Sequence, residues 1–367
     1  MMLESFLRLL NGEKPDEIIW TADLEYWLAG RRMYGSLDTK YEGERGRLRL
    51  SQELGILPYY WYEQFWLAKP EYDDVEVITE HKGGSDIRKW RTPVGEIEEV
   101  SEFTEESCSQ AVVKHSVRNE DDLKILLYIL EHRELKPANL DDYEHRRELY
   151  AEYDGIPSVA MPRSPISALA VEWCGIENLT YLIADCPELV ARVFALFEQQ
   201  EEPIIDAVCK VCPPLVLFAD NITSDFYTPF FDKYMKGPYR KRLDALHSAG
   251  VKCAVHLDGT VRGMLPKLAA VSFDAIEALT PAPVGDVPLE TMRGLAKSEA
   301  VILWGGMPGA MFCKPYTWDD VEKHLEKLFD CWGEQRFVLG MADQIPANGD
   351  IEICRKISEM VTPGRHK

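Results

Sequence analysis

The feature that most constrains the fold of this chain is a regular alternation of apolar runs and amphipathic segments between residues 157 and 361. The apolar runs are short and rich in Val, Leu, Ile and Phe, which is typical of strands buried on both faces of a sheet. Six strands are expected, at Pro157–Pro162, Leu215–Ala219, Val251–His256, Phe273–Ala278, Val301–Trp304 and Phe337–Met341. Helices are expected between and after them, at Cys186–Val208, Pro229–Ser248, Gly263–Ala270, Leu289–Lys297, Trp318–Cys331 and Ile351–Val361. This alternation predicts an α/β protein with a parallel sheet.

The order of these elements favours a (β/α)8 TIM barrel, and we expect residues 1–367 to form it as a single domain. The first strand is expected at Glu17–Trp20. Residues 1–150 also contain an elaboration with helices and an antiparallel hairpin, whose strands are expected at Val75–Glu80 and Ile87–Val100. An open, doubly wound sheet is the alternative. It is less favoured because no glycine-rich phosphate-binding turn follows the first strand.

The formal net charge of −21 excludes several classes of partner. Nucleic acid is not expected as a partner, because binding phosphates requires a basic face. No apolar run approaches the ~20 residues of a membrane span, and residues 1–14 lack the apolar core of a signal peptide, so we expect a cytoplasmic protein. The nine cysteines are then expected to be reduced thiols. Cys209 and Cys212 form the sole C-x-x-C pair, which is open to interpretation as half a zinc site or a redox pair.

A histidine and several carboxylates follow the apolar runs at the points where the expected strands end. His256 and Asp258 end one strand, Glu277 ends the next, and Asp343 follows the last. In an α/β barrel, the carboxyl ends of the strands form the mouth where the chemistry takes place. A histidine grouped with carboxylates suits a divalent cation, so these four residues are the predicted metal ligands, and zinc is the expected metal. Ordinary caps and ion pairs at solvated strand ends are the alternative.

Further residues near the expected mouth are candidates for binding or converting a substrate. Asp220 and Asn221 end the strand that precedes the strand of His256, and we expect them to orient the substrate. Asp343 is also a candidate general base. The candidates for an apolar wall around an aromatic substrate are Trp27, Tyr59, Trp304 and Met307. Burial in the core is the alternative for these aromatic side chains.

Three motifs resemble those of the uroporphyrinogen decarboxylase superfamily, and the resemblance covers nearly the whole chain. The run Trp90–Gly95 (WRTPVG) resembles a hairpin motif of that superfamily. The run Phe218–Asn221 (FADN), followed by Phe231 and the Pro238-Tyr239 pair, resembles its Asp-bearing strand and the helix after it. The run His256–Gly259 (HLDG) resembles its His-x-Cys-Gly or His-x-Asp-Gly strand end. The resemblance implies a (β/α)8 barrel and one of two activities, decarboxylation in the haem pathway or zinc-dependent methyl transfer with corrinoid proteins.

The methyltransferase branch resembles this chain more closely than the decarboxylase branch does. The decarboxylases carry an arginine-rich stretch after the first strand, whereas the run Thr21–Trp27 has two acids and no arginine. Two acids there would repel a substrate with several carboxylates of its own. The thiol-methylating members hold zinc with one histidine and two cysteines, and Asp258 and Asp343 align with the cysteine positions. Carboxylate ligands make zinc a stronger Lewis acid, which resembles the O-demethylase methyltransferases.

The sequence therefore predicts a metal-dependent methyltransferase that moves a methyl group from an O-methyl or N-methyl donor to a corrinoid protein. The corrinoid partner is expected to dock over the barrel mouth, because the chain has no cobalamin domain of its own. A decarboxylase that uses these carboxylates without a metal is the second hypothesis. The third is a binding protein that retains the barrel without catalysis.

Overall fold

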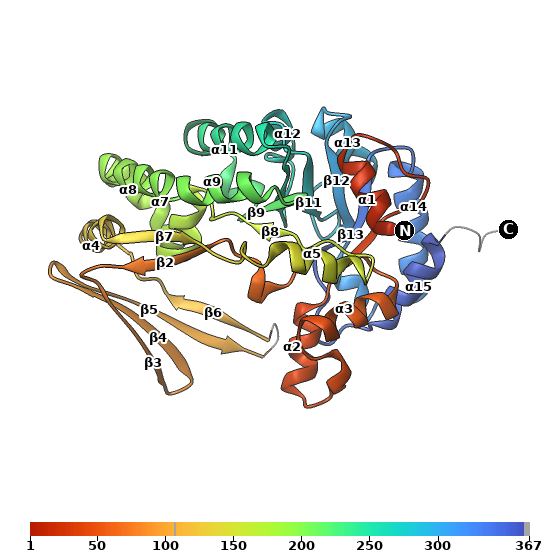
Figure 1. The fold of residues 1–367 in the computed structure, drawn as a ribbon, viewed down its shortest axis with the longest axis horizontal. Helices are drawn as coiled ribbons and strands as arrows, with labels where there is room; N and C mark the ends of the chain where they lie inside the picture. Colours follow the sequence, from red (N-terminus) through yellow and green to blue (C-terminus); the bar gives the residue numbers. More distant parts are fainter. Residues whose placement is uncertain (106–107, 363–367) are drawn as a thin grey trace.

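The computed structural model describes residues 1–105 and 108–362 and shows an α/β fold around a curled parallel sheet of seven strands (Figure 1). The strands are β1 (Trp20–Asp23), β8 (Val159–Ala160), β9 (Leu215–Ile222), β10 (Lys252–Leu257), β11 (Ala275–Leu279), β12 (Ile302–Met307) and β13 (Phe337–Gln344). Their order across the sheet is β1-β13-β12-β11-β10-β9-β8, and all neighbours are parallel. The first strand begins at Trp20, three residues after the predicted start, whereas the six later strands lie where the sequence predicts them.

Helices connect successive strands, as parallel pairing requires. Two predicted helices are divided. The segment from Cys186 to Val208 forms α8 and α9, and the segment from Pro229 to Ser248 contains a π-helical turn (Phe231–Met235) followed by α11. The helices after β8 are α6 (Pro165–Ala168), α7 (Gly175–Asp185), α8 (Pro187–Gln200), α9 (Glu202–Val211), α10 (Ser224–Tyr227), α11 (Lys236–Ser248), α12 (Leu265–Ala270), α13 (Leu289–Ala296), α14 (Trp318–Trp332) and α15 (Glu352–Val361). Their apolar faces pack against outward-facing strand residues and form the larger hydrophobic core.

The inside of the curl has its own apolar core, closed at the amino ends of the strands by α1 (Met2–Leu10). Phe6 of this helix packs edge-on against Trp304 of β12, with ring centroids 5.3 Å apart. Trp304 is fully buried there and donates a hydrogen bond from Nε1 to Oγ1 of Thr21 (2.8 Å). Gly340 on β13 makes room for this indole, because a Cβ atom at that position would lie 2.8 Å from the ring.

Residues 57–67 occupy the gap between β1 and β8 without forming a strand. The Leu57 amide donates to the carbonyl oxygen of Trp20, and on the other side the Ala160 amide donates to Phe65 (2.9 and 2.7 Å). Pro58 has no N–H to donate, and a 3₁₀ turn at Tyr62–Gln64 shortens the segment, so regular pairing is interrupted. The sheet therefore has seven strands where eight were predicted.

The amino-terminal half adds two antiparallel sheets and four helices to this framework. The predicted hairpin is part of a four-stranded sheet that projects from the molecule (Figure 1), formed by β3 (Glu76–Lys82), β4 (Ser85–Thr92), β5 (Gly95–Thr104) and β6 (Ser109–Lys114). A turn at Pro93 and Val94 divides the predicted second strand into β4 and β5. The remaining elements are α2 (Glu25–Met33), α3 (Gly43–Leu54), α4 (Glu120–Glu131), α5 (Tyr143–Ala151) and the pair β2 (Ala68–Tyr72) and β7 (Arg133–Pro137). In the described part of the chain, no helix combines the length and apolar character needed to cross a membrane.

Candidate active site at the carboxyl ends of the strands

Three strands carry an irregularity at the carboxyl end, and each irregularity contains a residue with positive φ. Between paired positions, β9 has extra residues relative to β10, β11 relative to β12, and β13 relative to β1. The residues with positive φ are Asn221 (52°), Ala278 (66°) and Asp343 (147°). Bulges of this kind turn side chains away from strict alternation, and unfavourable backbone conformations concentrate at functional sites. The irregular strand ends therefore mark this edge of the sheet as a candidate site.

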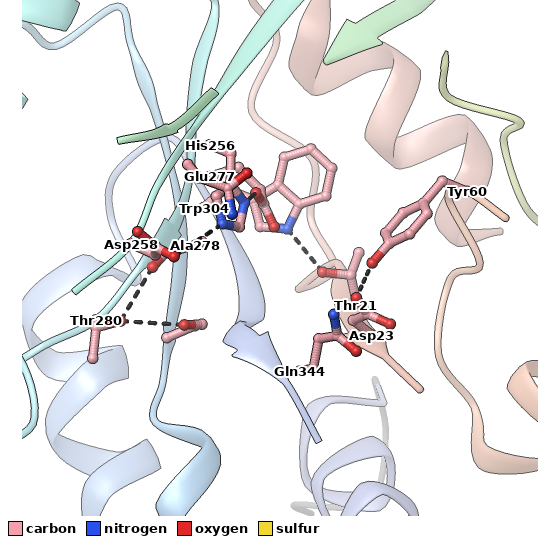
Figure 2. A network of polar contacts seen from close by, with 12 residues as sticks. Thr21, Asp23, Tyr60, His256, Asp258, Glu277, Ala278, Thr280, Trp304 and Gln344 are labelled. Carbon is pink, nitrogen blue, oxygen red and sulfur yellow. Dashed lines mark hydrogen bonds and ion pairs between the residues drawn. The ribbon is translucent and has the colours of Figure 1, made fainter. Parts of the chain in front are cut away.

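A threonine side chain ties two of these irregular ends together. The Thr280 hydroxyl lies within hydrogen-bonding distance of the carbonyl oxygens of Ala278 (3.3 Å) and Ala342 (3.2 Å), as Figure 2 shows. Thr280 is buried, so water does not compete for these contacts. The contacts fix the backbone beside Glu277 and Asp343.

A cavity of about 340 Å³ opens at this edge of the sheet. Its lining includes Asn221 and all four predicted metal ligands. Aromatic side chains form much of the remaining wall, namely Tyr26, Tyr59, Tyr60, Tyr62, Phe65 and Trp66. Four carboxylates face this space, from Asp23, Asp258, Glu277 and Asp343, whereas the cationic or titratable basic lining residues are Arg163 and His256. The cavity therefore combines an aromatic wall with an excess of negative charge.

His256 is held by carboxylates on both ring nitrogens (Figure 2). Its Nδ1 lies 2.6 Å from Oε2 of Glu277 on the neighbouring strand, and its Nε2 lies 3.5 Å from Oδ2 of Asp258. Burial lowers the pKa of His256, but the negative charges of Glu277 and Asp258 outweigh burial and raise it well above the usual value. The other carboxylate oxygen of Glu277 accepts a hydrogen bond from the Tyr59 hydroxyl (3.2 Å). Glu277 therefore fixes the orientation of the imidazole, and Tyr59 in turn fixes Glu277.

Two further acids in the cavity are difficult to ionise. Burial raises the pKa of Asp343 to about 6, and the charges of Asp258 and Glu277 add to this effect while His256 opposes it. Burial also raises the pKa of Asp23 well above its usual value, as does the charge of Glu25. Asp23 accepts hydrogen bonds from the hydroxyls of Tyr60 and Tyr62. Both acids can thus hold a proton at pH values where an exposed aspartate is ionised.

Asp220 does not reach this cavity, in contrast to the predicted role beside Asn221. Its side chain is fully buried, with one oxygen accepting from the Ser164 amide (2.8 Å) and the other from the Tyr239 hydroxyl (2.5 Å). Simple alternation along β9 explains the difference, because Leu217, Ala219 and Asn221 line the cavity, whereas Asp220 lies on the opposite face with Phe218 and Ile222.

Three of the four predicted substrate-wall residues also lie outside the cavity lining. Trp304 and Met307 are fully buried in β12, and Trp27 on α2 packs beneath the Arg31 guanidinium, 5.1 Å from its ring centroid. Tyr59 alone of the four lines the cavity. For Trp304 and Met307, the alternative of burial in the core is therefore correct.

The predicted site residues did not include five lining residues that contribute charge or hydroxyl groups, namely Asp23, Tyr26, Tyr60, Tyr62 and Arg163. Tyr60 and Tyr62 belong to the aromatic run beside Tyr59, and Asp23 ends β1 in the same way that Asp343 ends β13. The position of Asp23 at a strand end was a usable signal. Arg163 gave no such signal; it follows β8, stacks on Trp66 at 4.6 Å, and approaches Asn221 Oδ1 at 3.5 Å.

The donor set fits a divalent metal in part. His256 Nε2 and Asp258 Oδ2 are 3.5 Å apart, close to the separation of two ligands bonded to one zinc ion at ~2 Å each. Asp343 lines the same cavity. Glu277 instead occupies Nδ1 of the imidazole, which is the place of an orienting partner behind a metal-bound histidine. Among the described residues, the group of three potential metal-ligand atoms that all lie within 4.8 Å of one another is formed by His247, Cys253 and Asp274. These residues lie outside the cavity lining.

Comparisons with known proteins show similarity in fold. No protein-family model matches the chain, and no curated protein sequence matches it. Among solved structures, a methyltransferase from Methanosarcina mazei aligns with a TM-score of 0.61 and 12% identity over 98% of each chain. A B12-independent methionine synthase from Shewanella sp. W3-18-1 aligns with a TM-score of 0.50 and 12% identity, over 94% of this chain and 96% of that one. The curled α/β fold is therefore one that these two enzymes share.

Proposed function

We propose that this protein is a metal-dependent methyltransferase that moves a methyl group from an O-methyl or N-methyl donor to the corrinoid of a separate protein. The observation that carries the proposal is the His256 imidazole, oriented by Glu277 at Nδ1 with Nε2 beside Asp258, inside a cavity at the carboxyl ends of the strands. The fold similarity to the methyltransferase from Methanosarcina mazei supports the same class of reaction. We further assign the chain to the uroporphyrinogen decarboxylase superfamily, with residues 57–67 in the eighth position of a (β/α)8 barrel.

We assign His256 Nε2, Asp258 and Asp343 as the residues that would hold zinc, with Glu277 as a positioning residue. When bound, zinc would act as a Lewis acid on the heteroatom of the donor and so ease departure of the methyl group. Asp258 and Asp343 would offset its charge. With zinc bound, Glu277 would hold the neutral imidazole in the tautomer that leaves Nε2 free of a proton, because its carboxylate would accept the Nδ1 proton.

The chain's own residues would bind and orient the donor. Tyr59, Tyr62 and Phe65 offer an aromatic wall, and the Asn221 amide faces the same space. Asp343 has a second use, because a carboxyl group with a pKa of about 6 holds a proton up to about pH 6 and can pass it to the departing heteroatom. Ligation and proton transfer are separate roles for Asp343, and metal content distinguishes them.

The corrinoid partner would approach at the carboxyl edge of the sheet. Tyr26, which lines the cavity, has a side-chain hydrogen bond with Ser109 at the start of β6. The four-stranded antiparallel sheet therefore reaches the mouth, and we expect it to form part of the docking face. A decarboxylase acting on a polycarboxylate is less well supported, because acidic side chains outnumber basic ones in the cavity lining.

The test is methylation of cob(I)alamin, with O-methyl and N-methyl donors offered separately and the zinc content measured in parallel. We expect donor-dependent formation of methylcobalamin and stoichiometric zinc. Glu277→Gln should lower the rate by about 10- to 100-fold, as is typical when the partner behind a metal-bound histidine is lost. Asp343→Asn should lose zinc if Asp343 is a ligand, and should keep zinc but lose rate if it is an acid. Glu148→Gln, at an exposed position on α5, is the control. Full activity of zinc-free protein, or of Glu277→Gln, would overturn the assignment.

A further inference from the structure

The amino ends of β10 and β11 carry a second group of metal-ligating side chains, remote from the cavity. It consists of His247, Cys253 and Asp274, and one potential ligand atom from each lies within 4.8 Å of the other two. In the described ranges, no other set of three such residues meets this condition. The group includes a thiol, whereas the cavity at the carboxyl ends is lined by no cysteine. The two sites therefore differ in chemistry as well as in place.

Three separate elements bring these side chains together. His247 lies in the last turn of α11, Cys253 is the second residue of β10, and Asp274 immediately precedes β11. Cys253 belongs to the larger hydrophobic core between strands and helices, whereas the next residue, Ala254, belongs to the core inside the curl. The thiol therefore faces the helix layer. The backbone is fixed on both sides of Asp274, because its amide donates to Cys253 and its carbonyl accepts from Ile302 (both 2.9 Å).

The two oxygens of Asp274 have different surroundings. Oδ1 accepts from the Lys252 ammonium (3.1 Å), which leaves this oxygen already neutralised. Oδ2 lies 2.8 Å from His247 Nε2 and accepts from the Cys253 amide at 2.9 Å. Oδ2 therefore faces the imidazole and the backbone of the residue that carries the thiol, and it is the oxygen that lies nearest the other two potential ligands.

The thiol itself is poorly satisfied. Cys253 is completely buried, and its Sγ has a long contact of 3.9 Å to the carbonyl oxygen of Val251. Burial raises the pKa of this thiol well above its usual value, and the negative charge of Asp274 has the same effect. In the metal-free protein the thiol therefore keeps its proton, and a bound cation would have to displace it.

We propose that His247, Cys253 and Asp274 bind a zinc ion through the imidazole, the thiolate and Oδ2. Binding releases the thiol proton and leaves the imidazole neutral, so the thiolate and carboxylate together balance the two charges of the metal. The imidazole, thiolate and carboxylate donors are all established zinc ligands. The fourth position is open to water, because the His247 side chain is 32% exposed. The Cys253 amide then remains bonded to the ligating carboxylate as a supporting contact.

Such a site would be structural. It would join α11, β10 and β11 at the end of the sheet opposite the cavity, and metal bound to the folded state alone raises the unfolding temperature. This inference is independent of the proposed methyl transfer. It also means that the protein would hold two metals with distinguishable ligand sets, one with a thiolate and one without.

Cobalt(II) is the probe that separates the two sites, because only a cysteine ligand gives thiolate-to-cobalt charge-transfer absorption. Chelated, reduced full-length protein is titrated with Co²⁺ and then with Zn²⁺, and absorption, bound metal and unfolding temperature are recorded. We expect charge-transfer absorption that saturates at one equivalent, disappears on adding zinc, and accompanies a rise in unfolding temperature. His256→Ala should leave this absorption unchanged, since that residue lies at the other end of the sheet.

His247→Gln and Cys253→Ser are the informative variants, and both should lose the charge-transfer absorption. His247 is partly exposed, so its variant keeps the test valid if the buried Cys253→Ser protein does not fold. His81→Gln is the matched control, because His81 also pairs with an aspartate (Asp86, 2.7 Å) but on the exposed sheet and without a thiol nearby. Absorption that is absent from the wild-type protein, persists in His247→Gln, or instead requires Cys209 and Cys212 would overturn the assignment.

Discussion

A histidine–carboxylate pair lies at each end of the strands β10 and β11. The two pairs differ in the residues that surround them. At the carboxyl end, His256 lies 2.6 Å from Glu277 in an open cavity with three further carboxylates. At the amino end, His247 lies 2.8 Å from Asp274, whose other oxygen is neutralised by Lys252. The pairs are alike in geometry, so the difference in surroundings decides what each can do.

The comparison shows that an excess of acidic side chains and bulges within the strands occur together at the carboxyl ends. The bulges contain Asn221, Ala278 and Asp343, which have positive φ, and they border the cavity of about 340 Å³, whereas Phe6 of α1 packs against Trp304 on the amino side. Regular strand ends favour a structural role, since they hold side chains in a fixed alternation. An irregular, open end with unbalanced carboxylates favours ligand binding and catalysis.

Replacing each of the two histidines with alanine, one at a time, should give the largest difference between the two ends. We expect His256→Ala to lower methyl transfer to cob(I)alamin by at least about 100-fold, because it removes the group that faces both Asp258 and Glu277. His247→Ala should change the rate per folded molecule by less than about 2-fold, while lowering the unfolding temperature. Initial rates and thermal unfolding of both variants provide the measurement. Equal losses of rate would show that the two ends do not have separate roles.

The stability of the protein should depend on pH through Asp343, which has no counterpart at the amino end. The pKa of Asp343 is about 6 in the folded protein, above its usual value of 3.8, so folding favours the protonated form. Stability that depends on this proton is fully present below about pH 4 and is lost as pH rises from about 4 to about 6. Asp343→Asn mimics the protonated form, and we expect it to stabilise metal-free protein by about 3 kcal/mol near pH 8 and by about half as much near pH 5.

Urea unfolding of metal-free wild type and Asp343→Asn at the two pH values measures this difference. Asp319→Asn serves as the control, because Asp319 lies at an exposed position in the first turn of α14. The same stabilisation at both pH values would mean that the charge of Asp343 is not the cause.

The sequence predicted the framework of the fold well because the pattern of a parallel sheet is local. Apolar runs such as Phe337–Met341 are readable as buried strands, and each is extended by only a few residues in the structure. The four-stranded sheet was read as a hairpin because the turn between β4 and β5 was taken as part of one long strand and β6 was not recognised. The gap between β1 and β8 has a local cause, since Pro58 and a 3₁₀ turn interrupt a segment that otherwise lies in a strand position.

Alternation along the strands could have predicted part of the candidate site. His256 and Asp258 are two residues apart on β10, and simple alternation places both in the cavity. Alternation also separates Asn221, which lines the cavity with Ala219, from Asp220, which lies on the opposite face of β9. Trp304 was expected at the mouth, but it fills the inside of the curl, in space provided by Gly340 across the sheet. Such contacts join residues far apart in the chain and have no signature in the sequence.

The smallest expected effect concerns the hydroxyl of Tyr59. This prediction sharpens the comparison of the two ends, because the side-chain partners of Asp274 in the described part of the chain are His247, Lys252 and the Cys253 amide. Tyr59 donates to Glu277 Oε1 (3.2 Å), while its ring packs against Trp304 at 4.9 Å and against Tyr60 at 4.6 Å. Tyr59→Phe removes the hydrogen bond and keeps both ring contacts. We expect the rate of methyl transfer to fall by about 2- to 10-fold, since one hydrogen bond contributes about 0.5–1.5 kcal/mol.

Tyr143→Phe is the matched control for this change. Tyr143 is also buried and donates one hydrogen bond, to the carbonyl oxygen of Pro157 (2.9 Å), but it lies outside the cavity lining. Both variants should lose similar stability in urea unfolding, because each loses one buried hydrogen bond. Only Tyr59→Phe should lose rate, through weaker positioning of Glu277 and hence of His256. If both variants lost rate equally, the effect would follow from general destabilisation, and the chain of contacts from Tyr59 to His256 would have no part in catalysis.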